Sequence, residues 1–222
     1  MNNTATTLGI KVFDGMSITS ARFSNVTDIA NVSFEWYGAL KEVYFPKVKT
    51  IGGNAFYKAY NLGGAIDMPE VTSIGGNAFS GTSITGVNFP KLTVLNARVL
   101  SECGKLTSVC LPLVTAIKTA ALSSCTTLTT LDLPSVTFLD DQAFGDCISL
   151  ETLILRSDTV CTMAYQTALT SWNGATSSLI AQGKGYVYVP AALVDSYKAA
   201  TNWSVFADQI RAIEDYPDIT GG

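Results

Sequence analysis

An apolar residue followed by proline recurs along this chain at a nearly constant interval. The successive prolines are separated by 23, 21, 22 and 22 residues. The same step reaches Phe23-Ser24 upstream and Leu155-Arg156 downstream, two degenerate copies that lack the proline. This period predicts a tandem array of about six to seven units, and it constrains the fold more than any other feature. The five complete anchors are Phe45-Pro46, Met68-Pro69, Phe89-Pro90, Leu111-Pro112 and Leu133-Pro134.

Further apolar positions keep the register of the prolines. Branched apolar residues follow two and five residues after each anchor, and most copies carry leucine sixteen residues after it. A unit of this size cannot bury its apolar side alone, whereas stacked units bury the equivalent positions of their neighbours in one continuous core. The sequence therefore predicts a solenoid. Ten residues after the anchor comes a large apolar residue, namely Phe34, Phe56, Phe79, Leu100, Leu122 and Phe144.

Each unit contains an alternating segment that predicts a β-strand just before the proline. In the copy at 128–133, Leu131 and Leu133 would point into the core and Thr130 and Asp132 outward. The equivalent segments should form one parallel ladder, which each proline ends because it has no N–H to donate. We expect a second short extended stretch at 136–139 and a helical or 3₁₀ turn at 142–144. The glycine pairs at 52–53 and 75–76 are predicted to supply positive φ before this turn.

The repeating unit is Leu-Thr-x-Leu-x-Leu-Pro-x-Val-Thr-x-Ile, followed by Ala-Phe, then a cysteine and a leucine. It closely resembles the BspA-like (Treponema pallidum type) leucine-rich repeat of bacteria, over roughly residues 20–156. The resemblance implies a β-rich α/β leucine-rich-repeat solenoid. It also implies a surface or secreted protein associated with adhesion to host, matrix or microbial partners. The segment 185–213 resembles the C-terminal piece of such proteins in gut bacteria and their prophages.

The ends of the array depart from the period and predict caps, because an open coil would expose apolar columns and strand edges. Residues 1–19 would form an N-terminal cap or truncated coil before a solenoid at 20–156. Residues 157–213 would form an irregular last coil and a cap with a helix at 191–200. Residues 214–222 are predicted to be a flexible tail. The segment 1–7 lacks the basic and apolar regions of a signal peptide.

Composition argues against several classes of function. The chain has no histidine, which is the commonest general base and a frequent zinc ligand. The net charge is −4 without a basic run, which disfavours nucleic-acid binding. Hydrophobic residues reach 47%, but no stretch is long and apolar enough to span a membrane. We therefore expect no enzyme activity, no cofactor, no metal and no membrane insertion, and we expect a monomer.

The outward positions of the predicted strands are the candidate ligand-binding face. Their identities are mostly polar and differ from copy to copy, as a ligand-reading surface of a repeat protein would allow. A solvated face whose sequence has drifted is the alternative. The candidate residues are Arg22, Glu42, Tyr44, Asp67, Asn88, Cys110, Thr130 and Asp132.

Three other groups have simpler structural interpretations. Cys103, Cys125 and Cys147 stand 22 residues apart and are expected to line the interior of the turns, not to form a metal or redox site. The acids Asp140, Asp141 and Asp146 suggest a turn more than a calcium site, because other copies lack them. Packing is likewise the default for the aromatic residues that could stack on sugars, namely Trp36, Trp172, Trp203 and Tyr165.

These observations favour a non-catalytic interaction or adhesion module that binds a protein or glycan ligand. We expect an extracellular or cell-surface location. A receptor-binding or tail-associated protein of a phage or prophage, located in the virion, is one alternative. A structural spacer within a larger surface protein is another.

Overall fold

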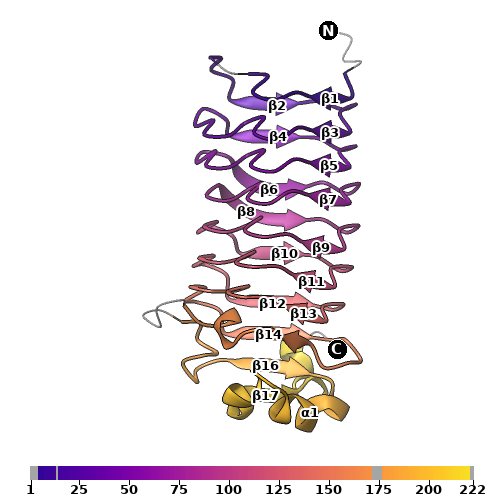
Figure 1. Cartoon of the computed structure of the whole chain (residues 1–222), viewed down its shortest axis with the longest axis vertical. Helices are drawn as coiled ribbons and strands as arrows, with labels where there is room; N and C mark the ends of the chain where they lie inside the picture. The colour runs from indigo at the N-terminus through magenta and orange to yellow at the C-terminus, as the bar shows by residue number, and fades with distance from the viewer. Residues whose placement is uncertain (1–4, 14, 172–176, 221–222) are drawn as a thin grey trace.

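In the computed structural model the chain winds into an elongated stack of coils with short helices at its C-terminal end (Figure 1). The structure describes residues 5–13, 15–171 and 177–220. Each complete coil has three sides, because two strand segments alternate with a run of turns. The predicted solenoid is confirmed.

The longer strands form the main ladder of the stack. All of them run parallel, and partners one coil apart are in register, as Asp132 is with Ile154. The ladder is divided into three hydrogen-bonded sheets, β2-β4, β6-β8-β10 and β12-β14-β16-β17, instead of the single one predicted. The first break adjoins the irregular pairing at Gly64 and Ala65, within the 23-residue step between Pro46 and Pro69. The strands are β2 (Ser20–Arg22), β4 (Glu42–Tyr44), β6 (Gly63–Asp67), β8 (Ser83–Asn88), β10 (Ser108–Cys110), β12 (Thr130–Leu133), β14 (Thr152–Leu155), β16 (Tyr186–Val189) and β17 (Ile210–Ala212).

The described chain therefore stacks about nine coils, more than the six to seven predicted. The two additional strands, β16 and β17, come from the part of the chain where the proline period is lost. They pair in register with the regular strands, so the ladder continues through an insertion that hides it in the sequence.

Two-residue strands form a second ladder on another side of the coils. They divide into the sheets β1-β3-β5-β7 and β9-β11-β13-β15. The break follows the copy that is one residue short, and there the side-chain amide of Asn96 donates to the carbonyl of Ile74 at 2.8 Å. The strands are β1 (Thr7–Leu8), β3 (Asp28–Ile29), β5 (Thr50–Ile51), β7 (Ser73–Ile74), β9 (Val94–Leu95), β11 (Ala116–Ile117), β13 (Phe138–Leu139) and β15 (Thr162–Met163).

The third side of each regular coil is a run of turns, and the helical turn predicted at 142–144 is wrong. Alternate N–H groups donate to carbonyls of the next coil, as those of Asn54, Phe56 and Lys58 do to Gly76, Ala78 and Ser80 at 2.7 to 3.0 Å. In each coil, two residues adopt positive φ in the left-handed region to make this alternation. They stand eight and twelve residues after the anchor. The first set is Val32, Asn54, Asn77, Arg98, Ala120 and Gln142; the second is Trp36, Lys58, Gly81, Glu102, Ser124 and Asp146.

The first glycine of each pair serves close approach between coils, and neither pair has the positive φ that was predicted for it. In the second and third coils the positive φ belongs to Asn54 and Asn77. A Cβ atom on Gly52 would lie 2.3 Å from the backbone nitrogen of Asn31, and one on Gly75 would lie 2.4 Å from that of Gly53. Backbone of one coil therefore occupies the space that a side chain at these positions would need.

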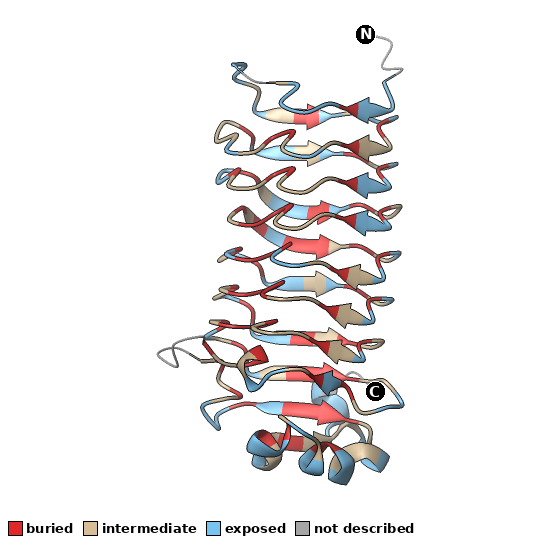
Figure 2. Cartoon of the chain, viewed as in Figure 1, coloured by how far each residue is buried: buried red, intermediate tan, exposed pale blue. Residues whose placement is uncertain are grey.

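The core runs the length of the stack between the three sides (Figure 2). At its N-terminal end the rings of Phe34, Phe56 and Phe79 lie one above another, with centroids 5.1 and 5.0 Å apart and nearly parallel planes. Leu100 and Leu122 continue the column, and Phe144 ends it; all of them are fully buried. The sequence column ten residues after the anchor is thus a continuous apolar stack, as predicted.

The C-terminal end is covered by short helices: η1 (Gln166–Ala168) in the insertion, then η2 (Ala191–Leu193), α1 (Val194–Ala199), η3 (Ser204–Gln209), η4 (Ile213–Asp215) and α2 (Pro217–Thr220). Two large aromatic residues, Tyr197 and Trp203, are fully buried beneath them with ring centroids 5.2 Å apart. Both bond to Cys161: its N–H donates to the Tyr197 hydroxyl, and Trp203 Nε1 donates to its carbonyl. The predicted domain boundaries and the flexibility of 214–222 stay predictions.

Candidate ligand-binding face

The predicted face residues occupy two adjacent columns on the main ladder. Arg22 lies opposite Tyr44, and Asn88 lies opposite both Asp67 and Cys110. Glu42 and Thr130 belong to the neighbouring column, two residues before Tyr44 and Asp132. Arg22, Glu42, Tyr44, Asp67, Cys110 and Thr130 are exposed, and Asn88 and Asp132 are half-buried. With coils about 4.8 Å apart, the column from Arg22 to Asp132 spans roughly 24 Å.

Side chains on this face are tied to one another across coils. Arg22 pairs with Glu42 at 3.1 Å, and the Asn88 amide donates to Asp67 at 2.9 Å. Asp132 accepts from both Nε and Nη2 of Arg156, at 2.8 to 3.0 Å. A two-pronged guanidinium contact fixes the carboxylate orientation better than a single bond would. Exposed pairs of this kind add little stability, so their effect is to hold the polar groups in place.

Small residues make the N-terminal half of the face uneven. A hollow of about 260 Å³ lies over β6, β8 and β10, and Asp67, Asn88 and Cys110 line it. Its floor includes Gly86, where a Cβ atom would lie 2.4 Å from Ser108 Oγ. A second hollow, of about 510 Å³, is lined by Thr19, Lys41, Glu42, Gly63 and Gly64. The face can therefore receive a protruding side chain between its polar groups.

The C-terminal end of the column is covered. Ile154, which continues the outward column because it is in register with Asp132, is only 2% exposed, as is Tyr188, the next residue in register. The ring of Tyr216 packs on that of Tyr188 with centroids 5.3 Å apart, because the chain after β17 returns to this part of the face. Burial raises the pKa of Tyr188, with Tyr216 adding to the shift. Residue spacing gave no sign of this contact, which joins two parts of the chain outside the regular period.

Residues 1–70 and 49–169 match the family described as BspA type leucine rich repeat region, in six copies. The chain belongs to this family. Leucine-rich repeats of this kind form a protein-interaction module, typically without catalytic activity. No helix of the described BspA-type chain is both long and apolar enough to cross a membrane.

Three solved structures are similar to this BspA-type chain. A leucine-rich repeat protein from Bacteroides ovatus has 16% identity and a TM-score of 0.39, over 93% of this chain and 69% of that one. A leucine-rich cell surface protein from Faecalibacterium prausnitzii has 15% identity and a TM-score of 0.29, over 93% of this chain and 82% of that one. The pneumococcal vaccine antigen PcpA has 10% identity and a TM-score of 0.35, over 94% of this chain and 83% of that one. Likenesses this distant give no information about function. A search of the curated proteins found no match.

The cysteine column of the BspA-type coils lies inside the turns. Cys103, Cys125 and Cys147 are fully buried, and each thiol donates to a carbonyl of the preceding coil at 3.0 to 3.2 Å. In the coil before them Thr82 stands at the equivalent position, and its hydroxyl donates to the carbonyl of Phe79 in its own coil at 2.8 Å. Burial raises the pKa of Cys103 to about 11, and the contact with Cys147 together with burial raises that of Cys125. All three thiols satisfy buried carbonyls, and Cys103 and Cys125 stay protonated at neutral pH.

The acidic residues Asp140 and Asp141 are occupied by hydrogen bonds. Asp140 accepts from Thr119 at 3.1 Å and from the N–H of Asp141 at 2.9 Å. Asp141 accepts from Thr167 at 2.5 Å. Asp146 stands at a left-handed corner. Within the described ranges, no three acidic or cysteine residues lie in an arrangement that could hold a metal ion.

The structure separates the four aromatic residues that could stack on sugars. Trp203 is fully buried in the C-terminal cap, whereas Trp36 and Tyr165 are each 57% exposed. Trp172 lies outside the described residues. The default expectation of packing therefore holds for Trp203 and is wrong for Trp36 and Tyr165.

Proposed function

We propose that this chain is an adhesion module of the cell surface or extracellular space that binds a protein partner on the strand face. The observation that carries the proposal is the column of exposed and half-buried, mostly polar side chains from Arg22 to Asp132, which differ from coil to coil and stand on a parallel ladder. A continuous core fixes the backbone beneath this column, so binding requires little ordering of the protein. The family supports the interaction role; the surface, the location and the partner are our proposal.

The hollow at Asp67, Asn88 and Cys110 is the proposed centre of the interface. Partners seat large side chains in such depressions, and polar groups around them set specificity. The preceding coils add an aromatic anchor, because Tyr44 is exposed and Arg22 lies over its ring, 6.0 Å from the centroid. Aromatic and arginine side chains are the residues most enriched among strong interface contacts.

Cys110 offers a direct test, because it is the exposed cysteine on this face and the other four are buried. Purified protein should be labelled at Cys110 with a maleimide carrying a polyethylene glycol chain. Binding of labelled and unlabelled protein to immobilised collagen, fibronectin and mucin would then be measured. We expect saturable binding of the unlabelled protein to at least one of them, weakened about tenfold or more by the label.

Two controls accompany the experiment. Cys110→Ser protein given the same treatment should bind at full strength, which excludes damage by the reagent. Asp67→Lys should weaken binding, whereas Thr93→Lys, an exposed position near the second ladder, should not. Binding that survives both the label and Asp67→Lys would contradict the strand-face proposal, and failure to bind any protein of the panel would contradict adhesion to these partners.

A further inference from the structure

Trp36 occupies a backbone position that is costly for a large side chain. Its φ is 59°, in the left-handed region. The equivalent corners of the following coils carry Lys58, Gly81, Glu102, Ser124 and Asp146, none of them aromatic. A bulky residue at positive φ is uncommon, and such strain gathers at functional sites. Because the indole is also 57% exposed, burial in the core does not explain its presence.

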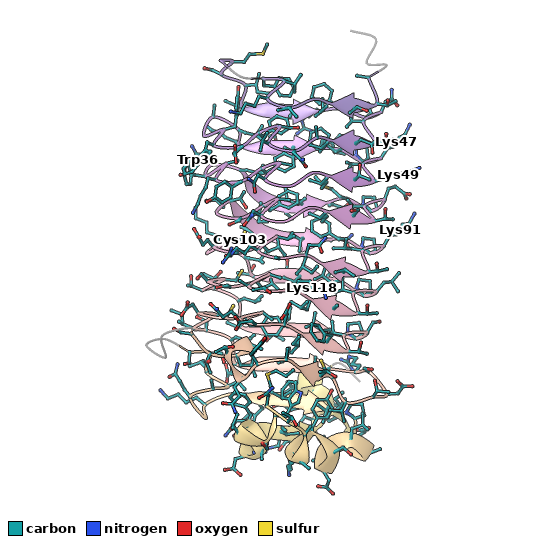
Figure 3. The ribbon with its side chains drawn as sticks, viewed as in Figure 1. Trp36, Lys47, Lys49, Lys91, Cys103 and Lys118 are labelled. Atoms are coloured by element: carbon teal, nitrogen blue, oxygen red, sulfur yellow. The ribbon has the colours of Figure 1, made fainter. Side chains whose placement is uncertain are left out.

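Neighbouring aromatic rings hold the indole at the edge of the stack. The ring centroids of Trp36 and Tyr57 are 5.6 Å apart, with an angle of 87° between the ring planes. For Trp36 and Tyr60 the centroid distance is 5.7 Å and the interplanar angle is 68°. Both neighbours approach in edge-to-face geometry, which orients the indole without stacking on its plane. Figure 3 shows Trp36 on the turn side of the stack, opposite the edge that carries Lys47, Lys49 and Lys91. The three rings form an aromatic platform, defined here as Trp36, Tyr57 and Tyr60.

Hydrogen-bonding groups lie beside this platform. A hollow of about 260 Å³ adjoins Trp36 and is lined by Lys11, Val32, Ser33, Glu35 and Tyr37. Glu35 uses Oε1 to accept from Asn54 at 3.0 Å, and the described hydrogen bonds do not engage Oε2. A smaller hollow of about 200 Å³ lies on the side of Met16, Gly38 and Ala39. A ligand with one apolar face and several hydroxyls would find partners for both.

Charges around the platform are balanced. Lys58 lies 5.7 Å from the centroid of the Tyr57 ring and forms an ion pair with Glu102, two coils away. Gly81 leaves room for this reach, because a Cβ atom there would lie 2.6 Å from Lys58 Cδ. Lys11 and Glu35 carry opposite charges in the hollow. The surroundings therefore favour an uncharged ligand over an acidic one.

By itself the platform is too small to form a stable protein interface. From the exposed fractions of Trp36 and Tyr60, 57% and 47%, the open aromatic surface is on the order of 250 Å². A specific protein interface buries about 800 Å² on each partner. A platform of this size matches one or two sugar rings.

We propose that the aromatic platform binds a neutral glycan, with the C–H face of a hexopyranose stacked on the Trp36 indole. Hydroxyl groups of the sugar donate to Glu35 and accept from Lys11 in the adjoining hollow. This site lies on the turn side of the coils, separate from the strand face, and does not depend on the function proposed for that face.

The test follows the indole N–H signals of the chain's three tryptophans by NMR during titration with lactose or chitotriose. Trp36→Phe assigns the Trp36 signal. Concentrations up to about 50 mM cover the millimolar affinity of a small contact. We expect one of the two sugars to shift the Trp36 signal saturably and leave the Trp203 signal, in the buried cap, unchanged. No saturable shift with either sugar would overturn the proposal.

Variants distinguish stacking on Trp36 from a general effect of the sugar. Trp36→Ala should weaken binding at least about tenfold, whereas Tyr165→Ala, which removes an equally exposed aromatic residue elsewhere, should not. Binding of these variants is followed by ligand-observed saturation transfer. Trp36→Gly should also lose binding but unfold at the same or a higher temperature, because glycine accepts positive φ. Retained binding in either Trp36 variant would overturn the proposal.

Two further results would contradict the assignment. Tighter binding of sialyllactose than of lactose would show that the site prefers an acidic ligand. A Trp36 signal that moves on dilution, together with a dimer in sedimentation, would show that the platform contacts a second copy of the chain. We expect neither result.

Discussion

At the scale of single residues, the described thiols show how one residue type serves two purposes. Four are buried, and the carbonyls that three of them bond to explain why cysteine recurs every 22 residues. Cys110 belongs to another position of the coil and lies on the exposed strand face. Residue spacing alone distinguished the buried cysteines from Cys110, because Cys103, Cys125 and Cys147 stand thirteen residues after their anchors whereas Cys110 stands in a strand. It could not show which carbonyl each thiol would meet.

The buried thiols predict a loss of stability at alkaline pH. Burial raises the pKa of Cys103 from 9.0 to about 11 and that of Cys161 to about 12. Because the folded pKa lies above the unfolded one, their contribution is fully present below about pH 9 and is lost as the pH rises through the folded values. The free energy of unfolding, measured with urea under reducing conditions, should fall between pH 8.5 and pH 11 by about 2 kcal/mol for Cys103 alone.

Cys103→Ala is the matched variant for this prediction, since Ala59 fills the equivalent position in an earlier coil. The variant should be less stable at pH 8 but should lose less stability on the way to pH 11. Equal pH slopes for the two proteins would contradict a role for the Cys103 thiol.

At the scale of elements, sequence patterns predicted the strands and missed the corners. The alternation of Leu131 and Leu133 with Thr130 and Asp132 predicted β12, which has that pattern of burial. For the turns, the sequence predicts a helical or 3₁₀ conformation. They are instead a third set of bonds between coils, made by alternating backbone conformations that residues as different as Asn77, Arg98 and Gln142 adopt at equivalent positions. Contacts with the next coil, and not local propensity, determine this conformation.

Close packing between corners predicts that two neighbouring glycines respond oppositely to alanine. At Gly75 the added Cβ would lie 2.4 Å from the backbone nitrogen of Gly53, which can move only by separating the coils. Gly75→Ala should therefore lower the free energy of unfolding by about 1–3 kcal/mol.

Gly53→Ala is the control, because the atom nearest to the added Cβ would be the carbonyl oxygen of Gly76 at 3.5 Å and the φ of Gly53 is not in the left-handed region. It should be neutral or stabilising by up to about 1 kcal/mol. Urea unfolding measures both variants, and equal effects would show that close approach does not explain Gly75.

At the scale of the whole molecule, each regular coil contacts mainly its neighbours, so stability is expected to be a sum of local terms. The regular coils were predictable because their period repeats. The return of Tyr216 onto Tyr188, which shortens the exposed face, was not, because it joins two positions outside the repeat. The strand-face residues were predicted as one surface; which of them contacts a ligand stays a proposal.

Removal of the C-terminal cap should loosen the stack from that end. Trp203 is fully buried and bonds to Cys161 across 42 positions of sequence. Trp203→Ala should cost about 3–5 kcal/mol. Hydrogen exchange measured by mass spectrometry should show the largest loss of protection in β16 and β17 and the smallest in β4, because coupling passes between neighbours. A uniform loss along the chain would instead indicate that the stack unfolds as one unit.

The left-handed corners also bear on how such a protein can change over generations. Each regular coil enters and leaves its corners with the same backbone geometry, so an in-frame duplication of one 22-residue unit would insert a coil whose neighbours need no rearrangement. Each duplication would lengthen the molecule by about 4.8 Å and add one new outward residue to each column. The gene can therefore alter the reach of the protein and its recognition residues separately, by copying a unit and then substituting positions that the core does not constrain.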